Sequence, residues 1–296
     1  MNHADENRGL LLGAIGVLGY SLTPPMTRLA VAELDPVTAG LGRSVLSAVL
    51  AIMVLAVQRD RWPERRHLPG LLVVSLGSII GFPLFLALAL QHVPAAHSAV
   101  VIGLLPLVTA LCGTLFDHDR PSRRFWLAAA AGSGCVVGFV FAESGWDLRA
   151  ADGFLLLSVL AGAVGYAEGG RLSRELEGRR VISWALVLSL PLLIGPVIWA
   201  VSRHGLHASP RAWGAFAYTG IVSMFLATWI WYAGLARGGV ARVSQVQLLQ
   251  PFLTIGASWW LLGERITTLT WVCAAVVLAT VMLSRGSVVH RRNPSA

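Results

Sequence analysis

Long apolar runs, separated by short polar stretches, dominate the chain. Each has roughly 18–24 residues, enough at 1.5 Å per residue to cross the ~30 Å hydrocarbon layer of a bilayer. Because the runs are continuously apolar rather than alternating, they indicate helices and not barrel strands. The pattern predicts an all-α integral membrane protein with about ten transmembrane helices, at residues 9–31, 36–58, 70–91, 94–116, 124–142, 153–172, 181–201, 212–235, 240–262 and 266–284.

The charges predict how these spans are oriented. Only 13% of the residues are charged, against roughly 25% in soluble domains. All 23 basic residues are arginines, and with an internal N-terminus 17 of them fall in cytoplasmic segments and 5 in external ones. This positive-inside bias predicts cytoplasmic termini, in what we expect to be a bacterial inner (plasma) membrane. The net charge of +8 is thus explained by the lipid bilayer as partner and does not indicate nucleic-acid binding.

An internal repeat organises the chain into two halves. The stretch that begins "LALQHVPAAHSAVV" at Leu88 aligns without a gap with the stretch from Ala233, at an offset of 145 residues. The matched positions include Pro106 with Pro251, Trp126 with Trp271, and Asp119-Arg120 with Glu264-Arg265. Such a repeat is a stronger fold signal than any local motif. We predict two five-helix repeats, at 9–142 and 153–285, followed by a basic cytoplasmic tail at 286–296.

An odd number of spans in each repeat would invert the second half relative to the first, as in many secondary transporters. The closing phrase of each half resembles the EamA repeat of the drug/metabolite transporter superfamily. The matching residues are Glu264 to Thr267 with Trp271, Asp119 to Ser122 with Trp126, the prolines Pro106 and Pro251, and the pairs Tyr20/Arg28 and Tyr166/Arg174. The first half departs from the family at His118 and Asp119, where Gly-Glu is usual. The resemblance covers residues 9–285 and implies import or export of amino acids, nucleobase-like compounds, sugars or drugs.

A polar stripe marks the ninth span. At 100° per residue its members lie on one face of a helix; they are Ser244, Gln247, Gln250, Pro251, Thr254 and Ser258. Amides facing lipid would be costly, so the stripe faces other helices or water. It predicts one wall of a substrate cavity, formed by Ser244, Gln247, Gln250 and Thr254. The alternative is a set of interhelical hydrogen bonds, worth about 1 kcal/mol each.

Arg43 lies about two turns into the second span, where a charge is functional or paired by default. Its planar fork matches a substrate carboxylate; the alternative is a pair with Glu33, Asp35 or a carbonyl at a helix end. In the first span, Pro24 and Pro25 predict either a break on the substrate path or a simple kink. At a break, Tyr20 and Thr23 would offer polar contacts.

Three further residues complete the candidate cavity and its coupling groups. Tyr166 is the counterpart of Tyr20 in the sixth span, and Trp231 in the eighth span would either stack on a substrate or pack in the core. Glu168 could carry a coupling proton or pair with Arg171 three residues on. His97 could titrate near neutral pH or be solvated at the interface.

The sequence therefore predicts a secondary transporter, and not an enzyme. We expect it to export a small polar metabolite, such as an amino acid or a related compound. The expected mechanism is alternating access, driven by a proton or substrate gradient. The alternatives are a multidrug or toxic-compound exporter of the same fold, and a channel or receptor. No cofactor or metal is expected. In the fifth span Ala130, Gly134 and Gly138 permit close packing, either within the chain or in a homodimer.

Overall fold

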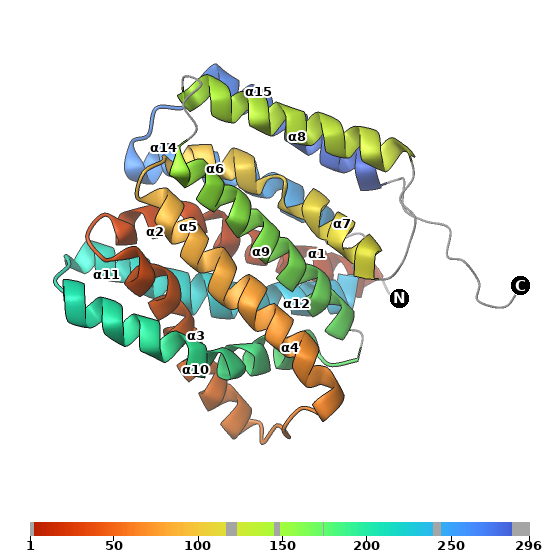
Figure 1. Cartoon of the computed structure of the whole chain (residues 1–296). Coiled ribbons are helices and arrows are strands. Elements are labelled where there is room, and N and C mark those ends of the chain that lie inside the picture. The colour runs from red at the N-terminus through yellow and green to blue at the C-terminus, as the bar shows by residue number, and fades with distance from the viewer. Residues whose placement is uncertain (1–2, 117–122, 145–148, 174, 239–243, 286–296) are drawn as a thin grey trace, which may run out of the picture.

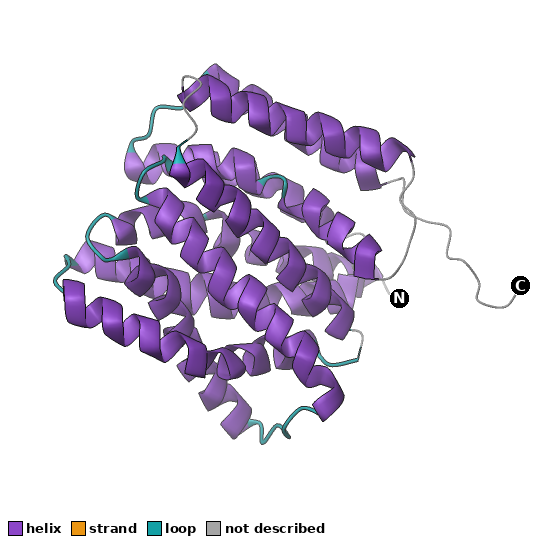
Figure 2. Ribbon diagram, in the orientation of Figure 1, coloured by secondary structure: helices purple, strands orange, loops and turns teal. Residues whose placement is uncertain are grey.

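The computed structural model describes residues 3–116, 123–144, 149–173, 175–238 and 244–285, and these form helices and turns without a strand (Figure 2). The first half contains α1 (His3–Ser21), α2 (Thr23–Val31), α3 (Pro36–Val57), the 3₁₀ turn η1 (Arg65–His67), α4 (Leu68–Val74), the π-helix η2 (Ser75–Gly81), α5 (Phe82–Leu90), α6 (Ala95–Ile102), α7 (Leu105–Phe116) and α8 (Arg123–Ser144). The second contains α9 (Ala150–Leu172), α10 (Gly178–His204), α11 (Pro210–Ala217), the π-helix η3 (Tyr218–Ala227), α12 (Thr228–Gly238), the 3₁₀-helix η4 (Ser244–Leu249), α14 (Gln250–Leu262) and α15 (Thr268–Arg285). The predicted tail at 286–296 and the Asp119 phrase lie outside the described residues.

The all-helical membrane architecture agrees with the sequence pattern. In the described part of the chain, six helices are long and apolar enough to cross a membrane: Asn7–Val31, Pro36–Val57, Arg65–Leu90, Ala150–Leu172, Gly178–His204 and Pro210–Trp231. Shorter apolar helices lie at Ala95–Thr109, Ala130–Ala142 and Thr268–Thr280. The count of ten spans stays a prediction, because the apolar helices of the fourth, fifth and tenth spans are shorter and the fourth and ninth spans are interrupted.

These interruptions fall at equivalent positions in the two halves. α6 ends at Ile102 and α7 begins at Leu105; η4 ends at Leu249 and α14 begins at Gln250, which is 145 residues after Leu105. The repeated proline is the second residue of α7 and of α14. In the first turn of a helix the missing N–H of proline costs little, and its fixed φ suits the helix. The prolines therefore lie in the first turn of α7 and of α14, where the helical geometry changes in mid-span.

Equivalent helices also make equivalent contacts. α1 packs against α12, and α5 packs against α9, so that the first span of each half lies on the third span of the other. α3 packs against α10. α8 packs against α15, and these two helices lie side by side along one edge of the molecule (Figure 1). The apolar core follows these pairs, with one cluster among α5, α6, α7 and α9 and another between α3, α4 and α10.

Hydrogen bonds join the two halves at one end of the molecule, which we call the Glu33 end. The carboxylate of Glu33, after α2, accepts hydrogen bonds from the backbone N–H and the hydroxyl of Ser209, at 2.6 and 2.7 Å. These bonds lower the pKa of the Glu33 carboxyl. Glu264, after α14, accepts from the N–H of Ala95 at the start of α6, at 2.8 Å. Arg211, beside Ser209, donates to a carbonyl near the end of α14, which joins the two sets.

The directions of the helices follow from these contacts. His97 on α6 hydrogen bonds to Asp152 in the first turn of α9, at 2.9 Å, so α9 begins at the Glu33 end. At the opposite end, Arg179 at the start of α10 donates to Asp60 after α3, and we call this the Asp60 end. Because α2 ends where α9 begins, the first and sixth spans run in opposite directions.

Candidate functional site

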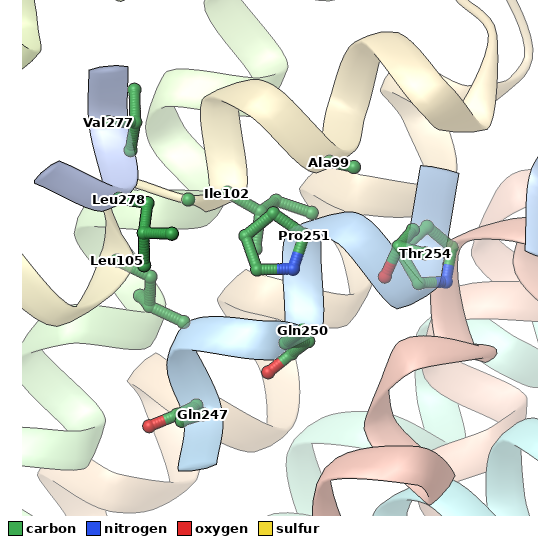
Figure 3. Close-up of a pocket in the computed structure, with 11 residues that line it drawn as sticks. Ala99, Ile102, Leu105, Gln247, Gln250, Pro251, Thr254, Val277 and Leu278 are labelled. Carbon is green, nitrogen blue, oxygen red and sulfur yellow. The ribbon is translucent and has the colours of Figure 1, made fainter. Parts of the chain in front are cut away.

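The main cavity, about 790 Å³ in volume, lies between the two halves. Its polar lining residues are Tyr20, Thr23, Arg43, Ser78, Tyr166, Ser223, Thr228, Gln247 and Gln250. Its apolar lining includes Val74, Phe82, Leu86, Ile102, Leu105, Ile182 and Met224. A side cavity of about 480 Å³ adjoins it and shares Pro24, Ile102, Leu105, Gln247 and Gln250 (Figure 3).

Irregular backbone segments of the third, fourth, eighth and ninth spans border the main cavity. Ile102 and Leu105 flank the break between α6 and α7, and Gln250 begins α14. Ser78 in η2 and Ser223 in η3 are 145 residues apart, and both line the main cavity. Within a bilayer, irregular backbone is tolerated where it is buried in protein or lines a wet cavity. π-helical segments also occur frequently at functional sites.

Residues of the polar stripe in the ninth span line the cavities and also form hydrogen bonds to backbone carbonyls. Gln247 and Gln250 line both cavities, and Figure 3 shows their amides on the same side of the chain. Thr254 lines the side cavity but also donates a hydrogen bond to the carbonyl of Ser21, at 2.8 Å. Ser258 bonds to the carbonyl of Thr254. The side chain of Ser244 lies outside the described part.

The stripe is not one α-helical face. Residues 244–249 form a 3₁₀-helix, which has 3.0 residues per turn, and the α-helix starts only at Gln250. The assumption of 100° per residue is therefore wrong for the first half of the stripe. Gln247 and Gln250 still share a side, because a spacing of three residues is one full 3₁₀ turn.

Arg43 lines the main cavity and is only 2% exposed. Its guanidinium donates to the hydroxyl of Thr27 at 3.3 Å, while its Nε has no partner. The alternative of an ion pair is not formed: Glu33 accepts hydrogen bonds from Ser209, and Asp35 accepts hydrogen bonds at the start of α3. Among the described residues, Arg43 has no acidic partner.

Two tyrosines and a threonine from the first spans of the halves line the same cavity. Tyr20 and Tyr166 are the paired aromatics of the repeat, and Thr23 hydrogen bonds to Ser223 across the halves. The first span is only kinked, because α1 and α2 are separated by Leu22 alone, whose carbonyl still accepts from a backbone N–H of α2. Trp231, in contrast, lines neither cavity; it packs edge-on against Tyr20 with ring centroids 6.4 Å apart.

The two candidate coupling groups lie away from both cavities. Glu168 is buried and forms the predicted ion pair with Arg171, at 2.5 Å. His97 is buried too, which contradicts the expectation of a solvated ring. Its Nε2 lies 2.9 Å from Asp152, and its ring packs on Phe139. Both residues thus have structural partners, and a coupling role stays a prediction.

The structure also places the closing phrase of the second half and the small residues of the fifth span. Glu264 caps α6 in the other half, where its carboxylate accepts hydrogen bonds from the backbone N–H groups of Ala95 and Ala96. In the fifth span, a Cβ added to Gly134 or Gly138 would meet no atom within 4 Å. The face of α8 that carries these two glycines therefore points away from the other described residues and does not pack against them. A homodimer contact through this face stays a prediction.

Sequence reasoning missed Ser78, Ser223 and Thr228 as lining residues. The signal that could have found the two serines is the repeat itself, since they are paired at its offset of 145. The π-helical segments η2 and η3, which turn these two serines toward the cavity, cannot be recognised from the pattern of apolar residues. The positions of the π-helical segments depend on tertiary packing.

The comparisons with known proteins decide the family. The sequence profile of the EamA-like transporter family matches residues 7–141 and again residues 149–286. The chain belongs to the EamA-like transporter family. These two EamA matches run over nearly the whole chain, and the fold agrees with a two-repeat EamA architecture. The family points to a transporter and not to an enzyme.

Two relatives whose names describe a transporter and an exporter agree with this EamA assignment. The chain is 43% identical to "Uncharacterized transporter YdeK" of Bacillus subtilis over 282 residues, 93% of this chain and 94% of that protein. It is 28% identical to "Probable terminal-alkyne amino-acid exporter" of Streptantibioticus cattleyicolor, covering 86% of this chain and 84% of that one. A crystal structure matches with a TM-score of 0.61 at 17% identity, covering 94% and 96% of the two chains, and shows a similar fold.

Proposed function

We propose that this EamA-like protein is a secondary transporter that exports a small polar metabolite, an amino acid or a related compound, by alternating access. One observation carries the proposal: the main cavity lies at the mid-span breaks and is lined by both halves, whose first spans run in opposite directions. Inverted repeats with discontinuous helices at the substrate site are the architecture of many carriers. The relative named as an amino-acid exporter supports the substrate class.

The orientation and the energy source are parts of the same proposal. The Asp60 end carries Arg59, Arg61, Arg65, Arg66, Arg179 and Arg180, which favours the cytoplasmic face of a bacterial plasma membrane. A proton or substrate gradient would drive transport. Rocking of one repeat against the other would expose the main cavity first to the Asp60 end and then to the Glu33 end.

The test is flux in sealed proteoliposomes against a panel of amino acids and related metabolites, with and without a proton gradient. Saturable uptake that is accelerated by substrate loaded on the opposite side supports a carrier. Flux that does not saturate and shows no counterflow would indicate a channel. Vesicles with protein that behave like empty vesicles across the whole panel would refute the proposal.

A further inference from the structure

The main cavity carries one positive charge and, among the described residues that line it, no negative one. Arg43 is the charged residue of the lining; the other polar members offer hydroxyl and amide groups. A guanidinium has five N–H donors in a planar fork. In the described structure one of them is used, toward Thr27. A buried cation without an anionic partner is costly, so the cavity favours a ligand that supplies the missing negative charge.

Neutral groups able to surround such a ligand lie in the same lining. The amides of Gln247 and Gln250 and the hydroxyls of Tyr166 and Ser78 form no hydrogen bond with other described residues. These groups can bind the polar substituents of a ligand whose carboxylate meets the guanidinium. The apolar lining from Val74 to Met224 can enclose its hydrocarbon part.

We infer that Arg43 is the carboxylate-binding residue of this cavity, and that the substrate carries a net negative charge. The class is an organic carboxylate, such as an amino acid whose amino group is acylated or absent. Among the described lining side chains an ammonium group would find hydroxyl and amide oxygens but no carboxylate, and it would lie in the field of Arg43. The inference rests on the proposed function, because it narrows the class of small polar metabolite that the transporter carries.

The test uses four derivatives of one skeleton that differ in charge. They are N-acetylphenylalanine, phenylalanine, N-acetylphenylalanine amide and phenylalanine amide, with the same series on leucine. Binding to the purified full-length protein is measured by thermal shift and calorimetry at about pH 6, where carboxylates are ionised and amines protonated. We expect the anion to bind most tightly, the zwitterion more weakly, then the neutral amide and last the cation.

The variants assign this preference to one side chain. Arg43→Gln should weaken binding of the anion by roughly 10- to 100-fold, the effect of losing charge-assisted hydrogen bonds, and remove the order of preference. Arg43→Lys should keep the preference at reduced affinity. Arg28→Gln is the matched control, since Arg28 donates to the Leu90 carbonyl and lines neither cavity; it should bind like the wild type. Unliganded melting curves show which variants are folded.

Three results would overturn the inference. They are equal or better binding of the neutral or cationic members, an unchanged anion preference in Arg43→Gln, and failure of every anion in both series to bind the wild-type protein. Vesicles with wild-type protein could instead transport a solute at a rate that depends neither on the charge of the solute nor on Arg43. That result would support the proposed transport function and reject only the carboxylate site.

Discussion

The Glu264 cap links the closing turn of the second half to a helix of the first. Its carboxylate accepts hydrogen bonds from Ala95 at 2.8 Å and Ala96 at 2.9 Å, two of the N–H groups that a helix start leaves without a partner. Both alanines are buried, so water replaces the carboxylate poorly. Losing a cap costs about 0.5–2 kcal/mol, and bonds to a charged group are at the upper end. We expect Glu264→Ala to destabilise the first turn of α6 by about 2 kcal/mol.

The assay is amide hydrogen exchange followed by mass spectrometry. A local opening that becomes easier by about 2 kcal/mol should speed exchange of the first amides of α6 by roughly 30-fold. Glu264→Gln keeps one acceptor oxygen and should give a smaller increase. The matched control is Arg265→Gln, because Arg265 is exposed and has no partner among the described residues. Unchanged exchange in Glu264→Ala, or an equal increase in Arg265→Gln, would refute the cap.

Three further predictions follow from the site and the Glu33 end. Gln247→Leu should lower vesicle flux without lowering the yield of folded protein, because it removes a polar group from both cavities; full activity would remove the ninth span from the substrate path. Glu168→Gln should lower the melting temperature but leave the pH dependence of flux unchanged, since Glu168 is paired with Arg171; a flattened pH profile would instead indicate proton coupling. Glu33 has a lowered pKa, so its stabilising effect is complete above its ordinary value of 4.5 and is lost as the pH falls through the lowered value. Melting curves from about pH 6 to about pH 3 should therefore fall more steeply for the wild type than for Glu33→Gln, and parallel curves would contradict this.

Sequence patterns predicted the helices, the two halves and six of the nine polar residues that line the main cavity, because each depends on spacing along the chain. Gln247 and Gln250 could be found since amides are costly in lipid, and Tyr166 since the repeat pairs it with Tyr20. What spacing could not reveal was the partner of each group. Arg43 has acidic residues nearby in sequence, yet these bind elsewhere, and Glu264 bonds to a helix almost 170 residues away.

The contacts at the two ends of the molecule have a consequence for the working cycle. Hydrogen bonds at the Glu33 end and ion pairs at the Asp60 end both join the halves, and a carrier that opens alternately must release one set in each half-cycle. The difference in strength between the sets would then determine which side the empty protein faces at rest. A substitution such as Glu33→Gln would shift this resting preference toward the state open at the Glu33 end. The apparent affinity for substrate would then rise when measured from the Glu33 end and fall when measured from the Asp60 end, although Glu33 does not contact the substrate.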